Sequence, residues 1–164
     1  MSHITVLGRE NNIRQQNLGM NVVLELSRPY FGTNRGVTAD NFFSGIALAT
    51  ELLRNGLTFV GTMRKTRREI PTELAIPRGR DLYSSIFVFR DDASLVSYKT
   101  HSSRIVLLLS TQHHERAIAP NRADEKPEII LHYNSTKGGV DSMDQMVGEF
   151  TCVRPTKRWP LKVL

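Results

Sequence analysis

The strongest constraint on the fold is a strand–helix–strand pattern in the first half of the chain. Val37 to Ala39 is typical of a short apolar strand that ends at Asp40, and Leu57 to Met63 is typical of a second strand. Between them, Ser44 to Arg54 carries apolar residues at helical spacing and is followed by Asn55-Gly56, a common helix end. A helix that connects two apolar strands predicts an α/β fold.

A second group of strands is predicted in the middle of the chain. Three short runs rich in strand-forming residues are separated by polar turns, and they cover Ser85 to Phe89, Ser94 to Lys99 and Arg104 to Ser110. This pattern predicts a small β meander. The polar segment Thr111 to Lys126 then predicts a loop.

The remaining segments are less regular. Residues 1–18 carry little pattern and predict a loosely ordered lead-in. The apolar spacing of Gly19 to Tyr30 fits both a helix and a strand. Glu128 to Tyr133 predicts a further strand, and Ser142 to Glu149 predicts a helix that is entered past Gly138-Gly139.

Size, charge and cysteine content narrow the class of protein. The chain has 164 residues, enough for one ordinary domain, and its 40% of hydrophobic residues are expected of a globular protein. The single cysteine, Cys152, excludes an intrachain disulfide and a cysteine-cluster zinc site within this chain. No apolar run is long enough to cross a bilayer, so no membrane partner is expected. The net charge of +6 favours a nucleic-acid partner, although many intracellular domains are mildly basic.

The positive charge is concentrated in two short segments. One follows the second predicted strand, and the other lies beside Trp159 near the end of the chain. An ordinary solvated surface also carries such charges, and Trp159 fits a ring that stacks on DNA as well as a ring that packs on the core. The candidate DNA-contact residues are Arg64, Lys65, Arg67, Arg68, Lys137, Arg154, Lys157 and Arg158.

Asp40, Asp141 and Asp144 each allow two interpretations. Asp40 precedes one predicted helix, and the other two lie near the start of another, where acids cap a helix or interact well with its dipole. Alternatively, a strand-end carboxylate and two carboxylates three residues apart on one helix face provide oxygen ligands for Mg²⁺. Phosphodiester chemistry with two metal ions needs several carboxylates from separate elements.

Two other motifs carry weaker signals. His113-His114-Glu115 contains metal-binding residue types, but adjacent histidines in regular structure do not readily face one metal ion. Gly138-Gly139 lacks the spacing of a phosphate-binding loop, and it favours a tight turn into the following helix instead.

Five separated motifs, taken in order along the chain, indicate one family. They are Gly36 to Phe43, Gly61 to Lys65 with Arg68 to Pro71, Leu95 to Lys99, Tyr133 to Met146, and Lys157 to Leu161. One of these motifs would be weak evidence, but five in order are strong. The chain resembles the piggyBac transposase family, and the resemblance covers nearly all of it from about Gly19 onward.

The resemblance implies a fold and a set of catalytic residues. The fold would be a partial RNase H-like α/β core formed by residues 19–63 and 134–150, with an all-β insertion at about 64–133; it also favours a helix for Gly19 to Tyr30. The family uses three aspartates on two metal ions. Asp40 matches the second, Asp141 matches the third with Asp144 close to it, and no residue before Asp40 matches the first.

The resemblance also implies cofactors, partners and a function. It implies Mg²⁺ or Mn²⁺, held weakly by Asp40 and Asp141, DNA as the partner, a nuclear location, and a homodimer as one option for the assembly. The expected function is that of a piggyBac transposable element-derived protein, a fragment of a DNA transposase catalytic domain that does not transpose alone. Two alternatives remain open: a non-catalytic DNA- or chromatin-binding module, and an active nuclease that receives the first acid from another chain.

Overall fold

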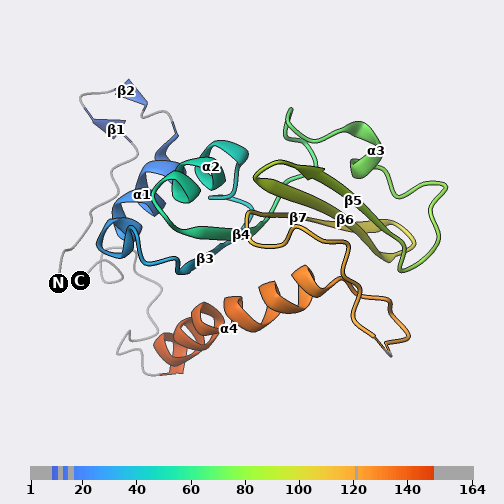
Figure 1. The fold of residues 1–164 in the computed structure, drawn as a ribbon. Helices are drawn as coiled ribbons and strands as arrows, with labels where there is room; N and C mark the ends of the chain where they lie inside the picture. Colours follow the sequence, from blue (N-terminus) through green and yellow to red (C-terminus); the bar gives the residue numbers. More distant parts are fainter. Residues whose placement is uncertain (1–8, 11–12, 15–16, 121, 150–164) are drawn as a thin grey trace.

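The computed structural model describes residues 9–10, 13–14, 17–120 and 122–149. At its centre lies a five-stranded mixed sheet with helices on both faces (Figure 1). The strands lie side by side in the order β3-β4-β7-β6-β5. They span Gly36–Ala39 (β3), Thr58–Thr62 (β4), Ser85–Arg90 (β5), Ala93–His101 (β6) and Arg104–Ser110 (β7).

Helix α2, Ile46–Arg54, connects strands β3 and β4, which pair in parallel. The helix buries Leu48, Ala49 and Leu52 and is followed by Gly56, whose φ of 67° is a left-handed conformation that glycine adopts without strain. The predicted strand–helix–strand unit is therefore confirmed, with differences of one or two residues at the element ends.

Strands β5, β6 and β7 form the predicted meander, because each pairs antiparallel with the next. Strand β7 also pairs antiparallel with β4, with Thr62 opposite Leu108. The meander therefore extends the sheet that β3 and β4 begin, and it does not form a separate sheet.

The two faces of the sheet are buried by different helices. Alternate residues of a strand point to opposite faces, so Phe59 and Leu109 lie in one core while Val60 and Leu108 lie in the other. The first core includes residues of helices α1 (Leu18–Ser27), α2 and α3 (Thr72–Ala75). The second core is closed by helix α4 (Glu128–Glu149), on the opposite side of the sheet (Figure 1).

The segment Gly19 to Tyr30, whose spacing fitted both a helix and a strand, is helical. It consists of most of α1 and of a short 3₁₀ helix, η1 (Arg28–Tyr30). Met20, Val23 and Leu24 pack on the first core from α1. The sequence spacing alone left both options open, and the contact with the sheet face decides between them. Before α1, the described residues Arg9–Glu10 and Ile13–Arg14 pair as a two-stranded sheet.

The prediction of a strand at Glu128 to Tyr133 is wrong. These residues form the first turns of α4, which continues for 22 residues without interruption at Gly138. Ile129, Ile130 and Tyr133 pack on the second core at helical spacing. Asp141 therefore lies in about the fourth turn of a long helix, not near its start, and the helix-dipole interpretation of this residue falls away.

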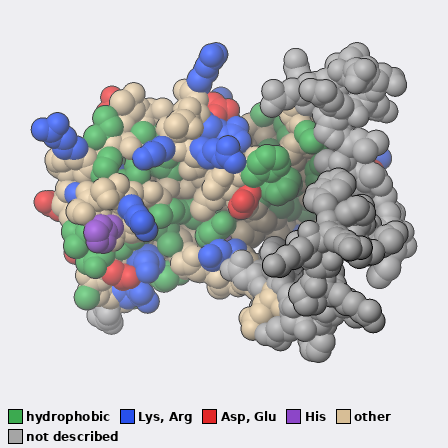
Figure 2. All heavy atoms as spheres, turned by 180° about the vertical axis from the view of Figure 1, so that it is seen from behind, with side chains coloured by type: hydrophobic (Ala, Val, Ile, Leu, Met, Phe, Trp, Pro, Cys, Tyr) green, Lys and Arg blue, Asp and Glu red, His purple; other side chains and the backbone are tan. Residues whose placement is uncertain are grey.

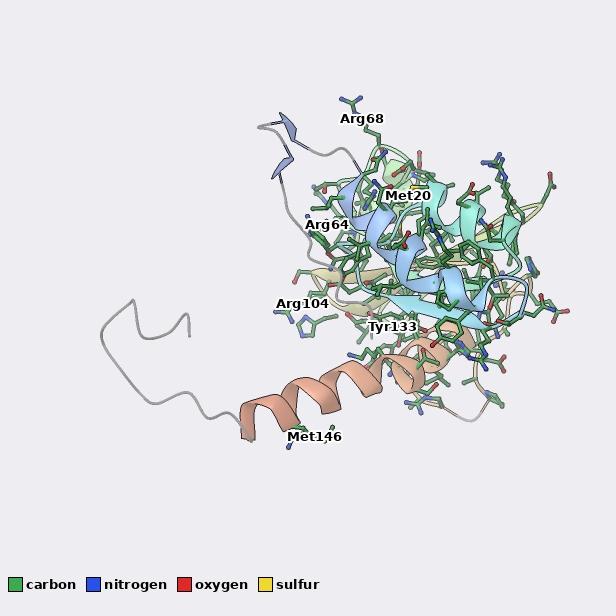
Figure 3. The ribbon with its side chains drawn as sticks, turned by 90° about the vertical axis from the view of Figure 1, so that its left-hand side faces the viewer. Met20, Arg64, Arg68, Arg104, Tyr133 and Met146 are labelled. Atoms are coloured by element: carbon green, nitrogen blue, oxygen red, sulfur yellow. The ribbon has the colours of Figure 1, made fainter. Side chains whose placement is uncertain are left out.

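Helix α4 is longer than the sheet that it covers. At 1.5 Å per residue it measures about 33 Å, and Figure 3 shows its far end, at Met146, projecting beyond the body of the molecule. No helix among the described residues is long and apolar enough to cross a membrane.

Gly61 in strand β4 lies where the chain comes closest to its neighbours. A Cβ atom at this position would lie 2.6 Å from Cζ of Phe59 and 2.9 Å from the carbonyl oxygen of Ala39, and it would also overlap Oγ of Ser44. Such a separation is too short for any side chain. The turn that follows β3 can therefore pack on β4 only because residue 61 is a glycine.

We expect Gly61→Ala to lower the free energy of unfolding by about 1–3 kcal/mol, because a methyl group in this space forces the neighbours apart. The matched control is Gly138→Ala in α4, where an added Cβ meets no atom within 4 Å. The control should raise the stability by about 0.5–1 kcal/mol, the usual gain from alanine over glycine inside a helix. Urea unfolding followed by circular dichroism measures both, and equal effects at the two sites would contradict the packing argument.

Candidate functional site at the end of strand β3

Asp40 directly follows strand β3 and opens a tight turn that ends at Ser44. The backbone N–H of Phe42 donates to Oδ1 of Asp40 at 2.9 Å, and the backbone N–H of Ser44 donates to the carbonyl oxygen of Asp40 at 3.0 Å. The hydroxyl of Ser44, which is fully buried, donates to the same carbonyl at 2.7 Å. A carboxylate that accepts from the N–H two residues on defines an Asx-turn.

The Asx-turn excludes the interpretation of Asp40 as a helix cap. Helix α2 starts at Ile46, and its N-cap residue, Gly45, provides no side-chain capping bond. The Asp40 carboxylate is exposed to solvent and uses one oxygen locally, while no described residue donates to the other oxygen. Asp40 is therefore available to an external ligand.

Helix α4 is fastened to strand β3 two residues before Asp40. The hydroxyl of Thr38 donates to the hydroxyl of Thr136 at 2.9 Å, and Thr136 in turn donates to the carbonyl oxygen of His132 at 2.9 Å. Val37 and Ala39 pack on the opposite face, in the core beneath α2. Because side chains alternate along a strand, Thr38 faces α4, and the next residue on the same side of the strand is Asp40.

Asp141 and Asp144 follow Thr136 on the same helix. Asp141 comes five residues later, a rise of about 7.5 Å along the helix axis. The side chains of both aspartates lie outside the part of the chain that the structure describes. The predicted convergence of the Asp40 and Asp141 carboxylates therefore stays a prediction.

The described residues do not form a metal centre on their own. No group of three or more His, Cys, Asp or Glu side chains comes together among them. At the end of β3, the Asp40 carboxylate has one oxygen that accepts no hydrogen bond from a described residue. Mg²⁺ usually takes one or two protein carboxylates together with water and substrate oxygens, so Asp40 alone supplies only part of such a site.

His113 makes a second connection between the sheet and helix α4. Oγ of Ser110 lies 2.9 Å from Nδ1 of His113, and the same oxygen accepts from the backbone N–H groups of Gln112 and His113. Since the hydroxyl already accepts twice, its own proton must be donated to Nδ1, and His113 is therefore neutral with its proton on Nε2. The imidazole packs edge-on against His132 of α4, with ring centroids 5.0 Å apart.

This arrangement gives His113 a structural role in place of the metal site that the His113-His114-Glu115 motif allowed. Burial lowers the pKa of His113 below its ordinary value, and the neighbouring His132 and His114 lower it further, while Glu128 acts in the opposite direction. Protonation would place a second proton at Nδ1, against the hydroxyl that now donates to it.

Four cations follow strand β4, and the first of them, Arg64, contacts the Asp40 turn. The guanidinium of Arg64 donates from Nε to Oδ1 of Asn41 at 2.8 Å and lies over the Phe42 ring, 6.0 Å from its centroid. The Arg67 guanidinium lies against Gly45, with Nη1 3.2 Å from where a Cβ would stand. Lys65 and Arg68 are exposed, and none of the four forms an ion pair with a described residue.

The parallel pairing of β3 and β4 explains this proximity, since Ala39 lies opposite Gly61 and the two strands end at the same edge. Figure 3 shows Arg64, Arg68 and Arg104 on the side toward which the far end of α4 projects. Figure 2 shows that Lys and Arg side chains also cover more of the rear face than Asp and Glu side chains do. Glu69 lies in the same segment as these cations, but no ion pair with a described residue neutralises any of the four.

Of the other predicted DNA contacts, Lys137 lies exposed on α4, with its ammonium 6.0 Å from the centroid of the Tyr133 ring. Arg154, Lys157 and Arg158 lie outside the described residues, as does Trp159. Sequence reasoning missed Phe42, which is 56% exposed, and the Thr38–Thr136 hydrogen bond. Strand alternation before Asp40 would have identified Thr38 as the residue that faces the next layer.

Comparison with known proteins shows the family to which the chain belongs. A family described as Transposase IS4 matches residues 4–164, and the chain belongs to this family of DDE transposases. A solved structure of the piggyBac transposase in a synaptic complex with hairpin DNA is similar over 96% of the chain, with 43% identity and a TM-score of 0.80. The resemblance to piggyBac transposases is thereby confirmed.

Two human proteins are more distant relatives. The PiggyBac transposable element-derived protein 3 and the chimeric ERCC6-PGBD3 protein are each 23% identical to the chain over 168 residues, which cover 93% of the chain. The chain spans 28% and 16% of these two proteins and 33% of the transposase in the solved structure. It therefore corresponds to one part of each relative.

Because His113 is held neutral, we expect stability to fall as the pH drops through the lowered pKa of this group. In the unfolded chain this histidine binds a proton near pH 6.5, whereas in the folded chain it binds one only at lower pH. The contribution of neutral His113 to stability is therefore complete above about pH 6.5 and is lost as the pH falls below this value. His113→Asn retains an acceptor for Ser110 but does not titrate. Its melting temperature should fall less between about pH 7.5 and about pH 5 than that of the wild type.

The matched control is His101→Asn at the exposed end of β6, which should behave like the wild type. If His113→Asn and the wild type lose the same amount of thermal stability on acidification, the neutral His113 is not part of the link to α4.

Proposed function

We propose that the chain is the part of a piggyBac-type transposase catalytic domain that carries the second and third catalytic carboxylates, and that it binds DNA beside them. The observation that carries this proposal is the Thr38–Thr136 hydrogen bond. It joins the strand that ends at Asp40 to the helix that carries Asp141. Two carboxylates from separate elements at one position are what metal-dependent phosphodiester chemistry requires.

The exposed edge of β3 supports a partial RNase H-like core. Among the described residues β3 pairs only with β4, and a hollow lies on each of its faces. One, of about 300 Å³, lies toward α4 and is lined by Thr38, His132 and Thr136; the other, of about 330 Å³, is lined by Leu26, Tyr30 and Leu57. A further strand paired with β3 would fill both hollows with alternate side chains.

Within this proposal, residues 19–63 and 134–150 belong to the core and about 64–133 to the β insertion. Helix α4 begins at Glu128, so its first turns extend the core element toward the insertion. The additional strand would carry the first catalytic carboxylate, for which the chain has no matching residue.

Divalent metal ions serve the DDE transposases generally, and Mg²⁺ or Mn²⁺ bound by Asp40 and Asp141 is part of the proposal. Bound there, such an ion would supply Lewis-acid chemistry to a phosphodiester. No residue of the chain matches the first of the family's three carboxylates, so the proposal for this chain alone is DNA binding without turnover. A homodimer and a nuclear location are proposed with it, and light scattering and imaging of a tagged protein test them.

The first test concerns DNA binding. Cations that neutralise phosphates release counterions, so the logarithm of affinity should fall steeply with the logarithm of salt concentration. Changing Arg64, Lys65, Arg67 and Arg68 together to Gln should flatten this slope by up to about 3–4, if each contacts one phosphate. Fluorescence anisotropy with a short duplex at several salt concentrations measures the slope.

A matched control removes the same charge elsewhere. The exposed residues Arg28, Arg54, Arg78 and Arg90 lie outside this loop, and their joint change to Gln lowers the net charge by the same amount. Equal slopes for the two variants would show that net charge, and not the loop beside Asp40, binds DNA.

The second test concerns catalysis. We expect no strand cleavage when the purified chain is incubated with Mg²⁺ or Mn²⁺ and transposon-end DNA. Without the first carboxylate, the charge that develops on the phosphate is not stabilised. Cleavage that is present in the wild type and absent in Asp40→Asn would overturn this expectation and favour an active nuclease instead.

One observation supports the alternative of a non-catalytic DNA- or chromatin-binding module: the cations that follow strand β4 form no ion pair with described residues and are thus available to a polyanion. Salt-dependent DNA binding that is the same with and without Mg²⁺, and that is unchanged in Asp40→Asn, would support this module.

A further inference from the structure

Phe42 is an apolar residue held in an exposed position beside the candidate catalytic carboxylate. Phe42 is 56% exposed, although it lies in a turn fixed by two hydrogen bonds, one from the N–H of Phe42 to the Asp40 carboxylate and one from the N–H of Ser44 to the Asp40 carbonyl. It packs edge-on against the Phe43 ring, with centroids 4.9 Å apart and planes at 86°. The turn therefore holds the ring in a defined orientation while leaving much of it uncovered.

Arg64 adds a cation to this ring. Its guanidinium lies 6.0 Å from the Phe42 centroid and is fixed by the hydrogen bond from Nε to Asn41. Proteins bind unpaired nucleobases with aromatic rings combined with cations, since every base has a face that stacks on a ring and every nucleotide carries a phosphate that attracts a cation. A duplex offers no free base face to such a ring.

We propose that Phe42 and Arg64 form a stacking platform for an unpaired nucleobase next to Asp40. This inference rests on the proposed DNA binding and specifies the state of the DNA at the site. The ring stacks on the base, Arg64 contacts the adjoining phosphate, and the phosphodiester beside that base lies within reach of the Asp40 carboxylate.

The chain contains a matched pair that separates this platform from a general surface effect. Tyr30 is 47% exposed, and the Arg35 guanidinium lies 5.2 Å from its centroid. Arg35 precedes β3 whereas Asp40 follows it, so the two aromatic–cation pairs lie near opposite ends of a strand about 13 Å long. Only the pair at Phe42 adjoins Asp40.

The experiment compares two DNA probes of equal length, a fully paired duplex and a duplex with a short unpaired bubble that contains 2-aminopurine. Wild-type protein should bind the bubble more tightly than the duplex and should quench the 2-aminopurine fluorescence. Phe42→Ala should weaken binding to the bubble by about 5- to 100-fold and leave duplex binding unchanged, because one stacked base is lost. Phe42→Trp should retain the preference, and Tyr30→Ala should behave as the wild type.

Phe42→Leu serves as a second variant, since it keeps an apolar side chain in the turn but offers no aromatic face. It should also lose the preference for the bubble. If both Phe42 variants weaken the two probes equally, or weaken neither, the platform does not exist although DNA binding stands. If the wild type binds neither probe, the proposed function itself is wrong.

Discussion

The burial of strand β4 on both of its faces determines the arrangement of the rest of the molecule. Phe59 and Val60 are adjacent in sequence, and each is almost completely buried in a different core. A strand with two apolar faces needs a covering layer on each side. Helix α2 provides one layer and α4 the other, so the residues at the end of β3 lie at a sheet edge that both layers approach.

The candidate site is held together by a few hydrogen bonds around that edge of the sheet. Three parts of the site are already fixed without a ligand. The Asp40 carboxylate is held by its own turn, Arg64 is held by Asn41, and helix α4 is held by Thr38. Groups that are already fixed lose little conformational freedom when they bind, which favours binding. The exposed cations nearby attract a polyanion without any further rearrangement.

The sequence predicted those parts of the fold in which local pattern and tertiary contacts agree. The strands of the meander alternate, helix α2 has an apolar stripe, and Asp40 stands at a strand end, so each could be predicted. Glu128 to Tyr133 could not, because the run Ile129-Ile130-Leu131 also fits a strand, and the contacts that make it helical come from β4, β6 and β7. The helix break predicted at Gly138-Gly139 was wrong for the same reason, since the tertiary packing of α4 outweighs the poor helix propensity of glycine.

Asp40 could be predicted as a site residue from the sequence pattern. Thr136 and His132 could not, because only long-range pairing brings them to the sheet.

Helix α4 extends well beyond the point at which the hydroxyl of Thr136 is hydrogen-bonded to Thr38 of β3, so a tilt of the helix at this point would displace the residues further along it. With Asp141 about 7.5 Å along the axis from Thr136, a tilt of about 10° at this point would shift the backbone of Asp141 by about 1 Å. A displacement of that size is enough to cost an enzyme about two orders of magnitude in rate. The hydroxyl pair Thr38–Thr136 therefore fixes α4 against β3 at a point from which a small tilt of the helix would move Asp141 appreciably.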